Sequence, residues 1–346
     1  MASHDLSNFE LIAHIGSGKT GSSSIQKTLS SNAETLKDHK VHYLGLMCEQ
    51  APEHQYSWQK PAGWPEWLKL PPERAGHELL EVLAKSIGIL KESGISKAIW
   101  SNESIFGNHQ KILPILHELH KMGAKISIIV YIRRHDSWLR SAYLQWGLKH
   151  KTYKGPVKSF NEWIKTQGVN FSGGLKPWIE ADWINLAVRN FDTCDDVVRD
   201  FLAYYEIDAG IALKRENETP HPVALSLWAT FNSQFEEPML PVHLQRLLQQ
   251  SGILDQEPID CDFGSLLPSD ADIADASKTC EEDKHAVNTI LERFGQPPLV
   301  ETPLSTKQYH VNQNQINAAL LLMLKKQNEQ INSLRNRLLK LEGNNE

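Results

Sequence analysis

The stretch that decides the fold is FELIAHI at residues 9–15, followed directly by GSGKTGSSSI at residues 16–25. The first part is a short apolar run typical of a buried strand, and Ile25 and Leu29 then follow a helical spacing. A glycine-rich turn between a strand and a helix leaves the first N–H groups of the helix unpaired, and the helix dipole adds positive charge there. Because Lys19 and the neighbouring hydroxyls add further donors, this stretch predicts a site for a phosphate or sulfate group.

Short apolar runs recur along the chain and alternate with longer helical patterns. They lie at residues 9–15, 41–46, 97–101, 125–132 and 184–190. Strands separated by helices predict a parallel sheet covered on both faces, and ligands bind beyond the carboxyl ends of such strands. We therefore expect an α/β protein, a P-loop-like three-layer sandwich with a central parallel sheet. Lys19, Glu103 and Arg133 each follow a predicted strand, so the three should meet at one edge of the sheet.

The turn resembles the end of a Walker A loop, in which a lysine and a hydroxyl bind a nucleoside triphosphate and its Mg²⁺. Ala13 stands where the strict motif has its first glycine, and this small replacement weighs little against ATP. A stronger objection is the lack of a strand ending in an aspartate that would hold Mg²⁺. The apolar run 125–132 ends in Arg133 and Arg134 instead. The sequence thus favours a phosphate ligand that needs no metal.

Two motifs together resemble the sulfotransferases that use 3′-phosphoadenylyl sulfate (PAPS). KTGSS at residues 19–23 has the form of their 5′-phosphosulfate loop, and Arg133 with Ser141, eight positions on, has the spacing of their 3′-phosphate motif. A guanidinium forks two donors onto a phosphate, and a hydroxyl at a helix start supplies another. This chain departs from the family at Arg134 and His135, where Asp-Pro is common, and in having two serines where Thr-Thr is common.

Weaker matches extend the resemblance over residues 8–300, to the bacterial carbohydrate-type branch of that family. Glu103 follows a strand in the place of a glutamate of the cleft, and Arg215 begins an Arg-x-Asn loop near the cofactor. The resemblance implies that PAPS is held by Gly18, Lys19, Thr20, Gly21, Ser22, Ser23, Arg133, Ser141 and Arg215.

The implied reaction moves a sulfonyl group from PAPS, the co-substrate, to a hydroxyl or amine of a glycan or glycolipid acceptor, with no metal. Lys19 would neutralise charge on the oxygen that bridges phosphate and sulfonyl, and Glu103 would take the proton of the acceptor. An isolated glutamate at a strand end more often pairs with a lysine or caps a helix. His54 and His109, in predicted loops, are alternative bases, whereas His14 lies within the first strand and is expected to be a core histidine.

Residues 55–72 hold three tryptophans among four prolines and predict an irregular loop. Flat aromatic faces suit stacking on sugar rings, so Trp58, Trp64 and Trp67 are candidate acceptor-binding residues. The alternative is that they cap a small satellite core, since tryptophan is often highly buried.

The composition is that of a globular protein, with 346 residues, 40% hydrophobic and 23% charged. The net charge of −6 argues against non-specific binding to nucleic acid. No apolar run approaches the length of a membrane span, about 18 residues, and no charged-then-apolar leader begins the chain. The four cysteines lack Cys-x-x-Cys spacing, which is typical of reduced structural residues. We expect a cytoplasmic protein.

Residues 312–342 contain no proline or glycine, and apolar residues recur there at alternating three- and four-residue steps. The stripe comprises Leu320, Leu324, Ile331, Leu334, Leu338 and Leu341, with polar Asn317 and Gln327 in the same seam. It predicts a coiled-coil helix that joins copies of the chain into a homo-oligomer, and packing back on the catalytic domain is the alternative. We expect a catalytic domain at 1–305 and this C-terminal helix at 306–346.

Two other functions stay open. One is a small-molecule or nucleotide kinase of P-loop type, against which the missing Mg²⁺ aspartate argues. The other is a catalytically silent nucleotide-binding scaffold that assembles through its C-terminal coil, against which the presence of Lys19 together with Glu103 argues. Saccharide, lipid-linked saccharide, peptide and small phenol acceptors are all compatible with the sequence.

Overall fold

The computed structural model describes residues 5–207, 210–214, 222–233, 235–240, 262–300 and 313–342. These residues form two compact units. The first unit comprises those within Met1–Trp138, Val169–Glu218 and Ser277–Thr302, and the second those within Leu139–Gly168, Thr219–Ala276 and Pro303–Glu346. In this division two earlier segments belong to the same unit as the C-terminal helix, and the predicted domain boundary after residue 305 stays a prediction.

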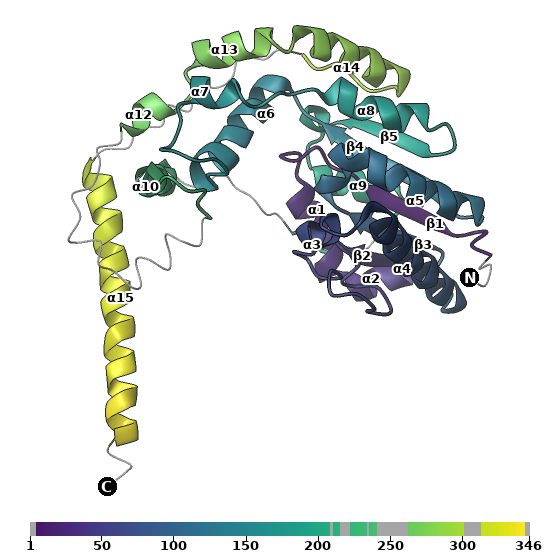
Figure 1. The fold of residues 1–346 in the computed structure, drawn as a ribbon, viewed down its shortest axis with the longest axis horizontal. Coiled ribbons are helices and arrows are strands. Elements are labelled where there is room, and N and C mark those ends of the chain that lie inside the picture. Colours follow the sequence, from purple (N-terminus) through teal and green to yellow (C-terminus); the bar gives the residue numbers. More distant parts are fainter. Residues whose placement is uncertain are drawn as a thin grey trace. The chain divides into compact units, whose positions relative to one another are not determined.

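A five-stranded parallel sheet forms the middle of the described part of the first unit (Figure 1). In the order β2-β3-β1-β4-β5, its strands are Val41–Gly45, Lys97–Ser101, Glu10–His14, Lys125–Ile132 and Asn185–Asn190. The α/β class with a central parallel sheet is confirmed, and each strand lies within an apolar run identified in the sequence. Since β1 lies between β3 and β4, the segments that follow these three strands meet at one edge.

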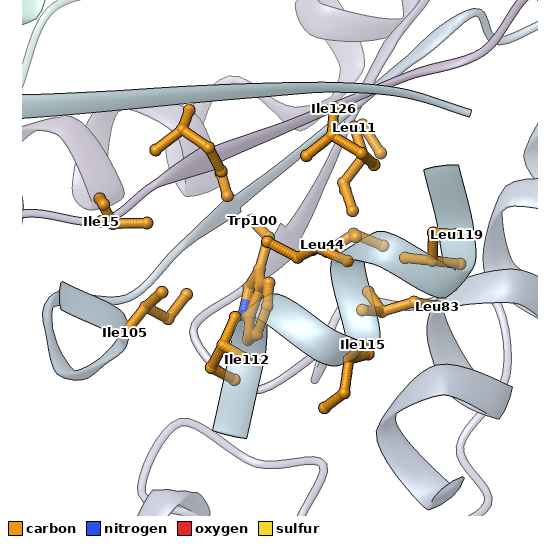
Figure 2. Packing of buried hydrophobic residues seen from close by; sticks show 14 of the residues in the cluster. Leu11, Ile15, Leu44, Leu83, Trp100, Ile105, Ile112, Ile115, Leu119 and Ile126 are labelled. Carbon is orange, nitrogen blue, oxygen red and sulfur yellow. The ribbon is translucent and has the colours of Figure 1, made fainter. Parts of the chain in front are cut away.

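Helices cover both faces of this sheet because the side chains of β1 alternate between two buried clusters. Leu11 and Ala13 belong to one cluster and Ile12 to the other. Figure 2 shows the first cluster, in which Leu11 and Trp100 of the sheet lie with side chains from α4 and α5. The helices of this unit are α1 (Ser22–Ser31), α2 (Ala33–Asp38), α3 (Trp64–Leu68), α4 (Pro72–Glu92), α5 (His109–Lys121), α8 (Phe171–Glu180), α9 (Val197–Tyr204) and α14 (Glu281–Arg293).

The second unit is helical in its described part. After α6 (His135–Ala142), which begins in the first unit, it contains a π-helical turn at Tyr143–Lys149 and the helices α7 (Phe160–Ile164), α10 (Pro222–Ser233), α12 (Phe263–Leu266), α13 (Asp270–Lys278) and α15 (Gln313–Glu342). Lys151 is fully buried there, and its ammonium donates hydrogen bonds to the backbone carbonyls of Gly155 and Phe235. These bonds give Lys151 a structural role.

The C-terminal helix is present as predicted, since α15 covers Gln313–Glu342. It contacts α10 of the same unit. Three members of its apolar stripe are more than half exposed: Ile331 at 56%, Leu334 at 58% and Leu338 at 59%. None of the described helices is both long and apolar enough to span a bilayer.

The tryptophan-rich segment 55–72 is not wholly irregular, because it contains the short helix α3. Trp58 and Trp67 are buried in the core. Nε1 of Trp58 donates to the Glu78 carboxylate at 2.8 Å, and Nε1 of Trp67 donates to a backbone carbonyl of α4 at 2.9 Å. A buried ring has no face available to a sugar, so these two residues act as the core residues of the alternative interpretation. For Trp64, which is half-buried, stacking on an acceptor stays a prediction.

Candidate anion-binding site

The turn after β1 has an unusual backbone. Gly18, Lys19 and Gly21 all have left-handed conformations, with φ of 69°, 56° and 80°. For a lysine this conformation costs about 1 kcal/mol, and such strain is found mainly where function requires it. The helix α1 begins directly after the turn, and no described side chain caps its N-terminus. A left-handed turn that leads into an uncapped helix start is a backbone arrangement that binds anions.

Three hydrogen bonds connect this turn to the end of β4 and the start of α6. Ser17 Oγ donates to a backbone carbonyl of β4 at 3.0 Å. The Arg133 guanidinium donates to the backbone carbonyl of Lys19 at 3.1 Å, and Nε1 of Trp138 donates to that of Gly18 at 3.0 Å. The Lys19 turn and Arg133 are therefore direct neighbours. Trp138 was not among the predicted site residues, and only the pairing of β4 with β1 reveals its role.

Arg133 is surrounded by groups that hold it in place. Its guanidinium carbon lies 5.1 Å from the centre of the Phe191 ring, and its Nε lies 3.9 Å from the Asp192 carboxylate. Burial lowers the pKa of Arg133, and Asp192 partly offsets this, but a guanidinium stays charged at neutral pH. Nε is buried without a hydrogen-bond partner among the described residues. An unused, charged N–H donor suits an anionic oxygen.

Glu103 follows β3, the other neighbour of β1. It is solvent-accessible, yet protein surrounds it on most sides, and this desolvation raises its pKa above the usual range. The Ser22 hydroxyl and then the Lys19 ammonium lower the pKa in part, although no hydrogen bond of ordinary geometry joins Ser22 to Glu103. Glu103 thus lies within the electrostatic reach of Lys19. Of the alternative bases, His54 donates a hydrogen bond from Nε2 to the Glu49 carbonyl, 2.7 Å away, and His109 begins α5.

His14 is the core histidine that its place in β1 predicts, but one of its ring nitrogens is unused. The side chain is fully buried, Nδ1 lies 2.7 Å from Ser101 Oγ, and Nε2 has no hydrogen-bond partner among the described residues. Burial lowers the pKa of His14 to about 4, so the ring is neutral at pH 7. Thr20 Oγ1 and Ser22 Oγ are likewise buried without a described partner. Buried polar atoms rarely lack a hydrogen-bond partner, so these three atoms, His14 Nε2, Thr20 Oγ1 and Ser22 Oγ, indicate a binding site.

The predicted cofactor residues at positions 18–23 and Arg133 are thus brought together. Ser141 lies in α6 within the second unit, and its cooperation with Arg133 stays a prediction. Arg215 lies outside the described residues. Just before it, the backbones of Lys214 and Ala212 are hydrogen-bonded to the side chains of Thr28 in α1 and of Asn32 directly after α1.

Arg134 and His135, where the chain departs from the sulfotransferase pattern, are both paired with acids. The Arg134 guanidinium binds Asp136 at 2.6 Å, and His135 Nε2 lies 2.7 Å from the Asp283 carboxylate. Arg134, His135 and Asp136 line a small, open hollow together with Ser277, Lys284, Leu299 and Val300. The hollow contains none of the predicted cofactor residues.

Comparison with models of known protein families finds no match for this chain, and comparison with curated proteins finds none either. The functional assignment therefore depends on the motifs and on the geometry described above.

Proposed function

We propose that this chain is a PAPS-dependent sulfotransferase that transfers a sulfonyl group to a hydroxyl or amine of a glycan or glycolipid acceptor. The observation that carries the proposal is the contact between Arg133 and the Lys19 turn. PAPS has a phosphosulfate at its 5′ end and a phosphate at its 3′ position. A turn that binds the phosphosulfate and a guanidinium in contact with that turn can bind both anionic groups of one such nucleotide, and ATP has no 3′-phosphate for the guanidinium to bind.

In this proposal each part of the site has a separate task. The start of α1, with Thr20 and Ser22, binds the 5′-phosphosulfate, and Arg133 binds the 3′-phosphate. Sulfonyl transfer passes through a loose, in-line transition state, so positioning and charge stabilisation supply most of the catalysis. Lys19 stabilises negative charge on the leaving oxygen, while Glu103 accepts the proton of the attacking hydroxyl or amine. The raised pKa of Glu103 makes its carboxylate a stronger base.

A P-loop kinase is the second candidate, and one observation favours it. Glu103 is an acid at the end of the strand beside the loop, where it could help to hold the Mg²⁺ that ATP requires. The two candidates differ in the nucleotide they bind and in its need for a divalent cation.

We expect adenosine 3′,5′-bisphosphate to bind the purified chain in the presence of EDTA, measured by calorimetry and by thermal shift. Arg133→Ala should weaken this binding at least about tenfold, because it removes a charge-assisted contact with the 3′-phosphate. Adenosine 5′-monophosphate, which lacks that phosphate, is the matched control, and its affinity should not depend on Arg133.

ATP that binds only with Mg²⁺, together with no binding of the bisphosphate, would support the kinase and end the sulfotransferase proposal. Transfer of radiolabelled sulfate from PAPS over a panel of saccharide, lipid-linked saccharide and phenol acceptors then identifies the acceptor class. Binding of the bisphosphate without transfer to any acceptor would favour the scaffold function.

We further propose that α15 joins copies of the chain through a coiled coil, since its exposed residues Ile331, Leu334 and Leu338 occupy one seam at heptad spacing. Leu334→Asp should convert the oligomer to a monomer in multi-angle light scattering. Burying the aspartate charge in the seam costs more free energy than the apolar contacts of the seam supply. Asn336→Asp, which puts the same charge on the opposite side of the helix, should leave the mass unchanged. An identical mass for wild type and Leu334→Asp would contradict the coiled coil.

A further inference from the structure

Three side chains from different elements converge beneath the anion-binding turn, at Gly16. A Cβ atom at this position would lie 2.5 Å from Ser22 Oγ, 3.4 Å from His14 Nε2 and 3.5 Å from Glu103 Cγ. A side chain at this position would displace the Ser22 hydroxyl. The absence of a side chain at Gly16 therefore lets the imidazole of β1 and the first hydroxyl of α1 approach each other.

The hydrogen bond between His14 and Ser101 determines which ring nitrogen carries the hydrogen. Ser101 is fully buried, and its hydroxyl has His14 Nδ1 as its partner, 2.7 Å away. If Nδ1–H donated to Ser101, the hydroxyl hydrogen of Ser101 would have no described acceptor. The hydroxyl must then donate to Nδ1, which places the ring hydrogen on Nε2. His14 thus presents a neutral N–H donor below the turn.

The Ser22 hydroxyl lies beside the same position, Gly16, and is a candidate partner for this donor. His14 Nε2 and Ser22 Oγ are both buried and without a hydrogen-bond partner among the described residues. A serine hydroxyl has a single hydrogen, and when its oxygen accepts a hydrogen bond, that hydrogen must point to another acceptor. With an anion in the turn, the acceptor is an anionic oxygen, and hydrogen bonds in such a series strengthen one another.

We propose that His14 is a positioning residue that donates a hydrogen bond from Nε2 to Ser22 Oγ in the anion-bound state and so directs the Ser22 hydroxyl toward the bound anion. This inference rests on the proposed function only in taking the turn as an anion site. It assigns the series of hydrogen bonds Ser101–His14–Ser22 to ligand binding, and Glu103 alone accepts the proton of the acceptor.

The test is a double-mutant cycle on the affinity for adenosine 3′,5′-bisphosphate, measured by calorimetry. His14→Leu and Ser22→Ala should each weaken binding about tenfold, the loss of one hydrogen bond to a charged group. The double variant should bind no more weakly than Ser22→Ala alone, because His14 acts through Ser22. His14→Gln, whose amide can also supply an N–H, should recover most of the affinity. Because His14 stays neutral, the ratio between wild type and His14→Leu should be the same at pH 6 and pH 8.

Arg133→Ala is the matched control, because Arg133 does not act through His14. The binding free energy lost in Arg133→Ala should therefore add to that lost in His14→Leu. The inference is overturned if the effects of His14→Leu and Ser22→Ala add, if His14→Leu binds as well as wild type, or if a folded His14→Gln binds as weakly as His14→Leu. Should His14→Leu not fold, Ser101→Ala takes its place in the cycle. It removes the group that sets the tautomer, so binding should weaken several-fold, and unchanged binding would overturn the inference.

Inorganic sulfate, as a second probe, separates this inference from the proposed function, because it needs the turn but not the nucleotide site. A wild type that binds sulfate but not the bisphosphate ends the sulfotransferase proposal, and the same cycle on sulfate then decides the role of His14. A wild type that binds neither probe overturns both.

Discussion

Lys19→Ala lowers kcat for sulfonyl transfer about a thousandfold, the largest loss expected from any single change at this site. In the proposed mechanism the ammonium lies at the anion-binding turn, so its removal leaves the charge that develops on the leaving oxygen without a lysine counter-ion. Affinity for adenosine 3′,5′-bisphosphate should fall less, because the helix start and Arg133 remain. Steady-state and single-turnover rates with PAPS measure the effect.

Lys27→Ala is the matched control, because Lys27 is an exposed lysine of the same helix α1 and should leave kcat unchanged. Lys19→Gly gives a second readout. Glycine adopts a φ of 56° without strain, so this variant should lose the same activity but unfold at a higher temperature than Lys19→Ala. A kcat for Lys19→Ala within tenfold of wild type would remove Lys19 from the catalytic step.

Glu103→Gln lowers kcat at least about a hundredfold, in line with the usual contribution of a general base, and leaves the affinity for the bisphosphate unchanged. The base must be deprotonated, so wild-type activity falls as the pH drops through the pKa of Glu103. Because burial raises that pKa, the fall should occur at a higher pH than for an ordinary carboxyl group. Both the loss of kcat and the position of the acidic fall are measured from the dependence of kcat on pH in wild type and in Glu103→Gln.

The raised pKa also has a consequence for stability. A carboxyl group that binds its proton more tightly in the folded state stabilises the fold below its unfolded pKa, and this stability is lost as the pH rises through the folded pKa. Glu103→Gln should therefore not lower the melting temperature at pH 7. If the acidic fall in kcat persisted in Glu103→Gln and disappeared in His109→Gln or His54→Gln, the base would be that histidine.

The sequence predicted the features that depend on neighbouring residues. Each strand of the sheet is an apolar run, and the turn at residues 16–21 depends on its own glycines. Both could therefore be predicted from the local sequence alone. The contact of Arg133 with the Lys19 turn was anticipated as well, because parallel strands end at a common edge. Features that depend on distant partners were missed. The unused nitrogen of His14 is defined by Ser101, and the bond from Trp138 to the turn requires β4 beside β1.

Burial was harder to predict than secondary structure. Trp58 and Trp67 look like surface aromatics in a proline-rich segment, yet Glu78 and the backbone of α4 supply acceptors for their indole N–H groups in the interior. Tryptophan can serve either role, and here the choice depends on packing against residues 8 and 20 positions away. The division of the chain into discontinuous units likewise depends on packing between distant segments, and no local composition change marks it.

The hydrogen bonds from Ser17, Arg133 and Trp138 to the turn and to β4 are already made before any ligand arrives. A loop that must order itself on binding loses conformational entropy, and its affinity is reduced accordingly. Here the turn is ordered during folding, so the binding energy of the proposed nucleotide would be available for discrimination between anions. Recognition by a preorganised loop of this kind depends on shape and charge rather than on induced fit.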